Sequence, residues 1–266
     1  MLADLHTHSI FSFDGKPGAT PDNMAQTAIA RGITHLAVTD HCDIDGELQG
    51  IYRIPDRDEL YEALMKAKKD YGDRLTILFG IELGQAHVCP DAARALLERY
   101  PYDIVLGSLH NLRGERDFYF FDYNAYTGEQ LEKLFDRVLD ETLEICGFPG
   151  IDVITHLSYI ERYMARAGLA LDYTRHLEKL EQLFERIIAR ELVLEVNTSD
   201  LASGYCLPPS PVLSLYRECG GTRICLGSDA HEPGAIGRNF DTAREMLLSL
   251  GFTELTIPRI GQYPIK

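Results

Sequence analysis

The sequence of 266 residues contains no continuous apolar run of 18 residues, so it has no segment that could form a transmembrane helix. Its N-terminus also lacks the basic region, the apolar region and the small-residue cleavage site that together mark a secretory signal peptide. We therefore expect a cytoplasmic protein with no membrane partner.

Paired cysteines and an excess of positive charge are missing as well. The 6 cysteines include no Cys-x-x-Cys pair, and a chain of this length does not need disulfide bonds, so we expect reduced thiols. Lys and Arg number 26 against 41 Asp and Glu, which gives a formal net charge of -15. Because nucleic acids are bound mainly through Lys and Arg, this charge argues against a nucleic-acid partner.

No Ser/Gly linker or low-complexity tract interrupts the chain, which predicts a single domain over residues 1–266. Seven short apolar runs rich in Val, Ile and Leu alternate with helical patterns. Runs of this kind are typical of strands buried on both faces of a parallel sheet. They cover residues 2–5, 33–38, 75–81, 102–106, 151–154, 192–196 and 222–226.

The helical patterns carry recognisable end signals. Thr20 and Pro21 are typical of a helix start, and Gly32 of a helix end. Another helix is expected to begin at Asp56 or Asp58. Residues 127–146 carry an apolar stripe with a period of 3.6 residues. The remaining helical patterns cover residues 173–190, 209–219 and 241–250.

Alternation of strands and helices predicts an α/β fold with a parallel sheet and right-handed crossovers. Seven such units suggest a barrel with one unit fewer than the usual eight, and periodicity alone leaves an open doubly wound sheet as the alternative. The polar residues favour the barrel, because a (β/α) barrel places its chemistry at the C-terminal ends of the strands.

Side chains that can bind metal follow almost every predicted strand. Six of the nine histidines lie at these strand ends, where a barrel would bring them together, whereas a single histidine there would be weak evidence for a metal site. The one exception is the sixth strand end, which carries Asn197, Thr198 and Ser199 instead. The candidate set is His6, His8, Asp40, His41, Glu82, His110, His156, Asp229 and His231.

The kinds of side chain in this set narrow the choice of metal. Imidazole and carboxylate groups without thiolate favour Zn, Mn or Fe over a Cys-rich structural zinc site or an oxygen-only Ca or Mg site. The set also exceeds what one four-coordinate ion can use, so we expect more than one ion.

The motifs DLHTH, FDG, TDH, GIE, GSLH, ITHL and GSDAH resemble, in order and spacing, those of the PHP (polymerase and histidinol phosphatase) family. The resemblance runs through almost the whole chain. The phrases HLSYIERY, EVNTS, PPSP and GSDAHEPGAIG are similar to the histidinol-phosphatase branch. This resemblance implies a distorted (β/α)7 TIM-like barrel that holds three divalent metal ions at the C-terminal ends of its strands.

Nine ligands follow from the resemblance, in three sets. It assigns His6, His8, Glu82 and Asp229 to one ion, Glu82 as a bridge with His110 and His156 to a second, and Asp14, His41 and His231 to a third. Asp14 rests on the family pattern alone, where some members have His. Asp4 and Asp40 are expected to support the ligands without binding metal.

The resemblance also implies an enzyme, a phosphoric monoester hydrolase that converts L-histidinol phosphate to L-histidinol and phosphate in histidine biosynthesis. A metal-bound hydroxide would be the nucleophile, and no GxSxG motif for a serine nucleophile appears. Asp229 and His231 are the candidates for protonating the leaving group. The alternatives are a PHP phosphoesterase for a nucleotide, a cyclic phosphate or phosphotyrosine, and a non-catalytic metal-binding module.

Four residues are candidates for binding this small phosphate ester. Arg162 follows the fifth strand end and could bind phosphate with its planar guanidinium, and Arg113 lies in the loop after His110. Asn197 and Ser199 offer polar groups at the sixth strand end. Histidinol phosphatases commonly continue NTSG into an arginine that faces the phosphate, whereas this chain has Asp200 after NTS, which weakens the assignment of the ester.

Overall fold

The computed structural model describes residues 1–265, and its central feature is a parallel sheet in which all seven predicted runs form strands. A further short strand, β3 (His41–Asp43), follows β2 and pairs with the C-terminal part of β4. The main strands pair in chain order: β1 (Ala3–Asp4), β2 (His35–Val38), β4 (Thr76–Gly84), β5 (Ile104–Ser108), β6 (Val153–Ile154), β7 (Val193–Asn197) and β8 (Ile224–Gly227).

Backbone hydrogen bonds join the first strand to the last. The Leu5 N–H donates to the Leu226 carbonyl at 3.0 Å, and the Asp229 N–H donates to the His6 carbonyl at 2.8 Å. An isolated parallel bridge between Thr7 and Ala230 continues this contact. The sheet therefore curls into a distorted (β/α)7 barrel, as predicted, and is not an open doubly wound sheet.

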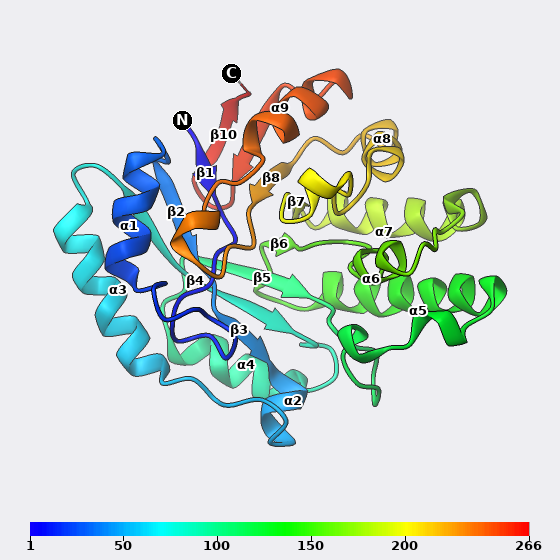
Figure 1. The fold of residues 1–266 in the computed structure, drawn as a ribbon, viewed down its shortest axis with the longest axis horizontal. Helices are drawn as coiled ribbons and strands as arrows, with labels where there is room; N and C mark the ends of the chain where they lie inside the picture. The colour runs from blue at the N-terminus through cyan, green and yellow to red at the C-terminus, as the bar shows by residue number, and fades with distance from the viewer. Residues whose placement is uncertain (266) are drawn as a thin grey trace.

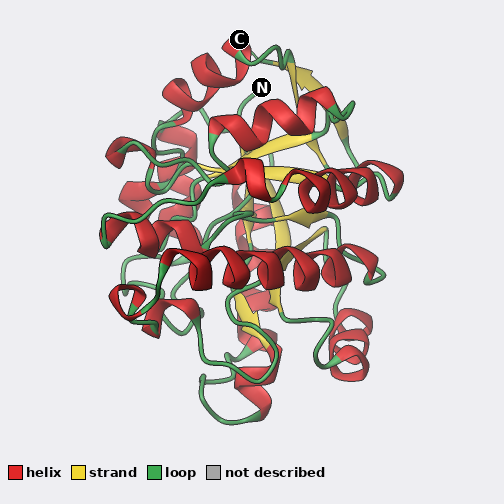
Figure 2. Ribbon diagram, turned by 90° about the vertical axis from the view of Figure 1, so that its right-hand side faces the viewer, coloured by secondary structure: helices red, strands yellow, loops and turns green. Residues whose placement is uncertain are grey.

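Helices surround the strands on the outside (Figures 1 and 2). The predicted helical patterns correspond to α1 (Pro21–Ala30), α3 (Arg57–Tyr71), α5 (Gly128–Gly147), α7 (Leu177–Ala189), α8 (Ser210–Glu218) and α9 (Phe240–Ser249). The structure adds α2 (Ile44–Leu48), α4 (Pro90–Arg99), α6 (Ile160–Arg166) and a C-terminal hairpin of β9 (Glu254–Ile257) and β10 (Gly261–Pro264). Among residues 1–265, every helix is too short or too polar to span a bilayer.

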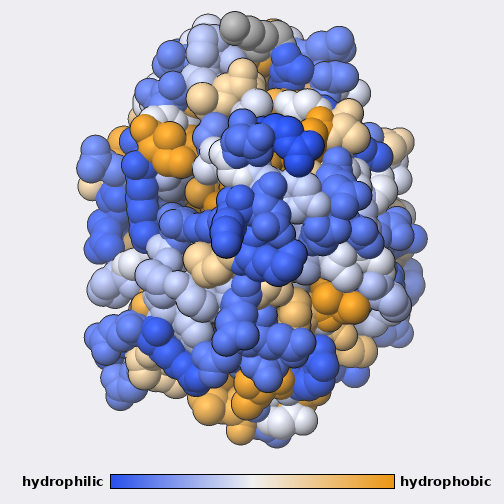
Figure 3. Space-filling model, turned by 90° about the vertical axis from the view of Figure 1, so that its left-hand side faces the viewer, coloured by the Kyte–Doolittle hydropathy of each residue, from blue (hydrophilic) through white to orange (hydrophobic). Residues whose placement is uncertain are grey.

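Local sequence explains where these helices begin. The Thr20 hydroxyl accepts a hydrogen bond from the Asn23 N–H at the start of α1, directly before Pro21. At the start of α5, Thr127 and Gln130 form a reciprocal capping box. The side of the molecule in Figure 3 is mainly hydrophilic, with small separate hydrophobic patches, as expected where the outer faces of helices meet water.

Close packing between strand and helix depends on a glycine in β5. A Cβ atom at Gly107 would lie 2.9 Å from Cγ2 of Ile145, on α5, and 2.9 Å from Cγ2 of Ile151. Branched side chains in a packed core have few alternative rotamers, so they have little room to move away. Gly107 thus fixes how closely α5 lies against the sheet.

Replacing Gly107 with Ala should lower the free energy of unfolding by about 1–3 kcal/mol, because the added methyl group overpacks this contact. Gly128→Ala is the matched control, since nothing lies within 4 Å of a Cβ there. Urea denaturation measures both variants. Equal stability of the Gly107 variant and the wild type would contradict the packing argument.

Candidate metal centre

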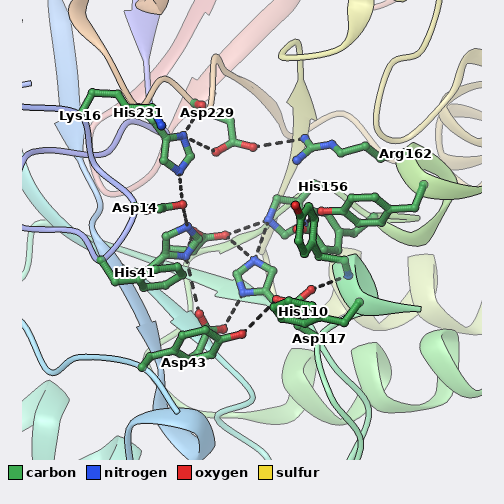
Figure 4. Close-up of a pocket in the computed structure, with 17 residues that line it drawn as sticks. Asp14, Lys16, His41, Asp43, His110, Asp117, His156, Arg162, Asp229 and His231 are labelled. Carbon is green, nitrogen blue, oxygen red and sulfur yellow. Dashed lines mark hydrogen bonds and ion pairs between the residues drawn. The ribbon is translucent and has the colours of Figure 1, made fainter. Parts of the chain in front are cut away.

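The C-terminal ends of the strands bring all nine predicted ligands together at one mouth of the barrel. His6 and His8 follow β1, Glu82 lies in β4, His110 follows β5 and Asp229 follows β8. The mouth opens into a cavity of about 490 Å³, lined by residues that include Asp14, His41, Glu82, His110, His156, Arg162, Asp229 and His231 (Figure 4).

The first predicted ligand set has the spacing of a metal site. Glu82 Oε2 lies 3.3 Å from His6 Nε2 and 3.5 Å from His8 Nε2, and Asp229 Oδ1 lies 3.2 Å from His8 Nε2. In a tetrahedral site with metal–ligand bonds of about 2.0–2.1 Å, ligand atoms lie about 3.3–3.4 Å apart. These four side chains could therefore hold one ion with little rearrangement.

The second set gathers around the other oxygen of Glu82. Glu82 Oε1 lies 3.1 Å from His110 Nε2 and 2.8 Å from His156 Nε2, and these two nitrogens lie 3.3 Å apart. Because each oxygen of Glu82 faces a different histidine group, its carboxylate has the arrangement of a bridging ligand.

The third set lies nearer to solvent. Asp14 Oδ2 lies 2.8 Å from His231 Nε2 and 3.6 Å from His41 Nε2. The ring of His41 also faces Glu82, with its Nδ1 2.8 Å from Oε2. In addition, His8, His41 and His231 each offer a ligand atom within 4.8 Å of the others, so His8 is an alternative partner in this set.

Several buried polar atoms in this cluster lie close to one another but make no contact with hydrogen-bond geometry. They are His6 Nε2, both ring nitrogens of His8, His41 Nδ1 and Glu82 Oε2. An unsatisfied buried polar atom costs about 1–3 kcal/mol, so a protein seldom leaves several in one place. Since all of them are nitrogen or carboxylate oxygen atoms that bind divalent metal, the residues present fit metal ions.

The electrostatics of the cluster also favour bound cations. Burial alone would lower the pKa of His6, but the carboxylates of Glu82, Glu195 and Asp229 raise it well above its usual range. Burial alone would raise the pKa of Glu82, but His41, His6 and His110 lower it well below its usual range. Burial together with the neighbouring His231 and His41 lowers the pKa of His8 to about 3, which keeps its ring neutral and able to bind metal.

Two buried carboxylates that the sequence reasoning missed orient the rings. Asp43 Oδ1 lies 2.6 Å from His110 Nδ1, and Glu195 Oε1 lies 2.7 Å from His6 Nδ1. In both histidines the opposite nitrogen, Nε2, faces Glu82. A carboxylate behind a histidine fixes its tautomer and strengthens it as a ligand. Asp43 could have been found, because it lies two residues after His41 and so on the same face of an extended strand.

Asp4 and Asp40, expected to have supporting roles, accept hydrogen bonds from neighbouring loops. Asp40 accepts from the backbone N–H and the hydroxyl of Ser9, next to His8. Asp4 accepts from the Ser228 and Gly237 N–H groups, next to Asp229 and in the loop before α9. These bonds fix the chain on both sides of the predicted ligands.

The backbone is strained at two of the predicted ligands. His156 has φ of 23° and Asp229 has φ of 53°, in the left-handed region that side chains other than glycine seldom adopt. Such conformations cost about 1–3 kcal/mol and persist where the surrounding structure enforces them. At His156 the backbone N–H donates to Glu195 Oε2 at 2.7 Å, which helps to hold this conformation.

Most of the residues that form this centre lie in a segment that matches a known protein family. The model of the PHP domain family matches residues 4–199, which includes most of the predicted ligands. The chain belongs to the PHP domain family.

Curated relatives resemble this PHP protein over nearly its full length. It is 28% identical to the "Probable histidinol-phosphatase" of Clostridium acetobutylicum, covering 92% of each chain. It is 24% identical to the "Histidinol-phosphatase" of Lactococcus lactis, covering 95% of this chain and 92% of the other.

Solved structures share the fold. The crystal structure of the Lactococcus lactis histidinol phosphate phosphatase, complexed with Zn, L-histidinol and phosphate, matches with a TM-score of 0.82 at 23% identity over 98% of both chains. One chain from the crystal structures of YwqE from Bacillus subtilis and CpsB from Streptococcus pneumoniae, described as metal-dependent tyrosine phosphatases, matches with a TM-score of 0.53 at 18% identity, over 93% of this chain and 87% of that chain.

Of the four predicted substrate residues of this PHP protein, three lie at or next to the cavity. Arg162 lines the cavity, and its Nη2 donates to Ser199 at 2.7 Å and to Asp229 at 3.2 Å. Its Nε lies 2.6 Å from Oδ2 of Asp200, the residue that departs from the family pattern. Asn197 donates to Asp229 Oδ2 at 3.4 Å, so Asn197 and Ser199 contact the residues of the mouth without lining the cavity.

The fourth predicted substrate residue, Arg113, lies away from the cavity. Its Nη2 pairs with Glu144 at 2.9 Å on an exposed part of the surface, and it is not among the residues that line the cavity. Its expected role in substrate binding stays a prediction that this placement does not support. Lys16, which the sequence reasoning did not consider, does line the cavity and supplies a positive charge near His231 (Figure 4).

Asp43→Asn should weaken metal binding about 10- to 100-fold, because an amide no longer holds His110 as strongly in its ligating tautomer. Chelator competition with the metal content read by mass spectrometry measures this effect. Asp152→Asn is the matched control, since Asp152 lies before β6 and pairs with Arg259. Equal metal affinity of the Asp43 variant and the wild type would contradict the role of this carboxylate.

Proposed function

We propose that this PHP protein is a metal-dependent phosphatase that hydrolyses L-histidinol phosphate to L-histidinol and inorganic phosphate. The observation that carries the chemistry is the cluster of buried, unpartnered imidazole and carboxylate atoms beside Arg162 at the cavity. The choice of ester is supported by the curated relatives named histidinol-phosphatase, which match over nearly their whole length.

The metals in this proposal are three divalent ions, of Zn, Mn or Fe, held by the three ligand sets described above. Ions bound there would lower the pKa of a water molecule and polarise the phosphoryl oxygens. The chain itself supplies a prearranged set of ligands, because Asp43 and Glu195 orient His110 and His6. Rings that are already oriented cost little further ordering when the site loads.

Arg162 is the proposed phosphate clamp. Its Nε faces Asp200 and its Nη2 faces Ser199 and Asp229, so three side chains fix the plane of the guanidinium at the edge of the cavity. The Nη1 group of Arg162 makes no hydrogen bond within residues 1–265, so this group and the positive charge are free to bind a phosphate. Asp200 thus holds Arg162 at the cavity, directly before the position where histidinol phosphatases commonly have a different arginine.

Asp229 and His231 are the proposed groups for protonating the leaving alkoxide. His231 lines the cavity, and its Nδ1 lies 3.0 Å from the Asp229 backbone carbonyl. Burial would lower the pKa of His231, but the adjacent Asp14 and Asp229 carboxylates raise it. Burial would raise the pKa of Asp229, but His6, His8 and Arg162 lower it well below its usual range, so His231 is the better proton donor of the two. His231 can donate only while its ring is not bound to the third ion, because a histidine ligand is unprotonated.

The wider assignment is a one-domain enzyme over residues 1–266 that takes part in histidine biosynthesis and acts on a small molecule. Cytoplasmic location and the lack of a nucleic-acid or membrane partner stay predictions from composition.

Metal removal is the first test of this function. Dialysis against a chelator should abolish phosphate release from L-histidinol phosphate, and Zn, Mn or Fe should restore it, because no serine or cysteine nucleophile is proposed. Phosphotyrosine and nucleoside monophosphates complete the panel of esters. Full activity on another ester, without turnover of L-histidinol phosphate, would refute the substrate, and chelator-resistant activity would refute the metal dependence.

Arg162→Met should raise KM for L-histidinol phosphate about 10- to 100-fold, because it removes charge-assisted hydrogen bonds worth about 1.5–3 kcal/mol. Steady-state phosphate release measures the change. Arg166→Met is the matched control, since Arg166 lies one turn later on α6, is exposed and approaches Asp200 only at 3.7 Å. An unchanged KM in the Arg162 variant would contradict the clamp.

A further inference from the structure

The cavity contains a carboxylate that the proposed chemistry does not use. Asp117 lines the cavity and is half-buried. Its Oδ1 accepts a hydrogen bond from the Tyr119 N–H at 2.7 Å, and its Oδ2 accepts one from the Tyr52 hydroxyl at 3.3 Å. Within residues 1–265, no Lys, Arg or His side chain lies within 4.0 Å of its oxygens as an ion-pair partner.

The hydrogen bond from the Tyr119 N–H does not explain why residue 117 is an aspartate and not a neutral residue. Asp117 precedes a three-residue 3-10 turn, Phe118–Phe120, and its Oδ1 caps that turn. An asparagine caps as well as an aspartate does, without a negative charge. Placing a charge in a partly buried cavity without an ion-pair partner is unfavourable. Burial raises the pKa of Asp117, and the nearby His110, a predicted metal ligand, lowers it only in part. A cation bound close to the oxygens of Asp117 would therefore stabilise this carboxylate.

Aromatic side chains line the cavity that contains this carboxylate. Phe13 stacks on Tyr52 at 4.7 Å and on His41 at 4.9 Å between ring centroids. Tyr119 packs edge to face against Tyr163 at 5.8 Å. Phe13, His41, Tyr52, Tyr119 and Tyr163 all line the cavity. Ring faces next to a carboxylate form an environment that binds organic cations and flat heterocycles.

The basic side chains of the cavity lie away from Asp117. In Figure 4, Asp117 lies at the lower end, near Asp43, whereas Arg162 and Lys16 lie at the upper end, together with the predicted metal ligands Asp14, Asp229 and His231. A ligand with a phosphate at one end and a positive charge at the other could bind Arg162 or Lys16 with its phosphate and Asp117 with its positive charge. L-Histidinol phosphate has this form, since it carries a phosphate, a protonated amine and an imidazole.

We propose that Asp117 is a specificity-determining residue that binds the positively charged part of the ester, so the site selects phosphate monoesters whose leaving alcohol carries a protonated amine. This inference rests on the proposed phosphatase function. It adds the residue by which the enzyme would distinguish one ester substrate from another.

Kinetics on two esters test this role with the metal-loaded, full-length protein. The quantity is the ratio of kcat/KM for L-histidinol phosphate to that for 3-phenylpropyl phosphate, an ester of similar size without a cationic group. Asp117→Asn should lower this ratio about 10- to 100-fold, the value of one charge-assisted hydrogen bond. The same variant should weaken binding of L-histidinol in calorimetry by a similar factor.

Glu115→Gln is the matched control, because Glu115 lies in the same loop and pairs with Arg137 at 2.6 Å outside the cavity. It should leave the ratio unchanged. Melting temperature and metal content establish that each variant is folded and loaded. An equal loss on both esters, which a purely structural role would produce, or an unchanged ratio in the Asp117 variant would overturn the proposal.

A second pair of esters tests Asp117 even if L-histidinol phosphate is not the substrate. If the wild type does not hydrolyse L-histidinol phosphate, the proposed substrate is wrong, and the ratio for phosphoethanolamine over ethyl phosphate tests Asp117 instead. A wild-type preference for the amine ester that Asp117→Asn removes would support the inference. No such preference would overturn it.

Discussion

The buried carboxylate of Glu82 is the contact on which the mouth of the barrel depends. Its Oε2 lies within 3.5 Å of nitrogens of His6, His8 and His41, and its Oε1 within 3.1 Å of His110 and His156. These five histidines come from four different strand ends. A carboxylate buried in this position is stable only with positive charge around it, so the strands that meet there are arranged to supply ligands for cations.

The barrel keeps these ligands in place through a layer of buried polar groups behind them. Glu195 binds the His6 ring with one oxygen and the His156 backbone with the other, and so links β7 to β1 and β6. Gly227 leaves room for this, because a Cβ there would lie 2.0 Å from Glu195 Oε1. Ligand orientation, strand spacing and the strained backbone at His156 are therefore parts of one packed unit.

The sequence was enough to predict the seven strands, the barrel and eight of the nine ligand candidates, because buried strands and their polar ends leave a local pattern. The ninth candidate, Asp14, came only from the resemblance to the PHP family. It could not predict Glu195, which lies inside an apolar strand and reaches the site only through tertiary packing. Short α2, α4 and α6 lack a long apolar stripe, so periodicity missed them. Arg113 lay in the expected loop, but Glu144 pairs with it on the surface, a contact between distant residues that no local pattern contains.

Anomalous X-ray diffraction at the absorption edges of Zn, Mn and Fe, on crystals of protein purified without chelator, tests the central claim most directly. The account predicts three peaks at the mouth of the barrel, two of them on either side of the Glu82 carboxylate and the third near Asp14, His41 and His231. Crystals with no anomalous peak within bonding distance of Glu82, even after soaking in these metals, would contradict it.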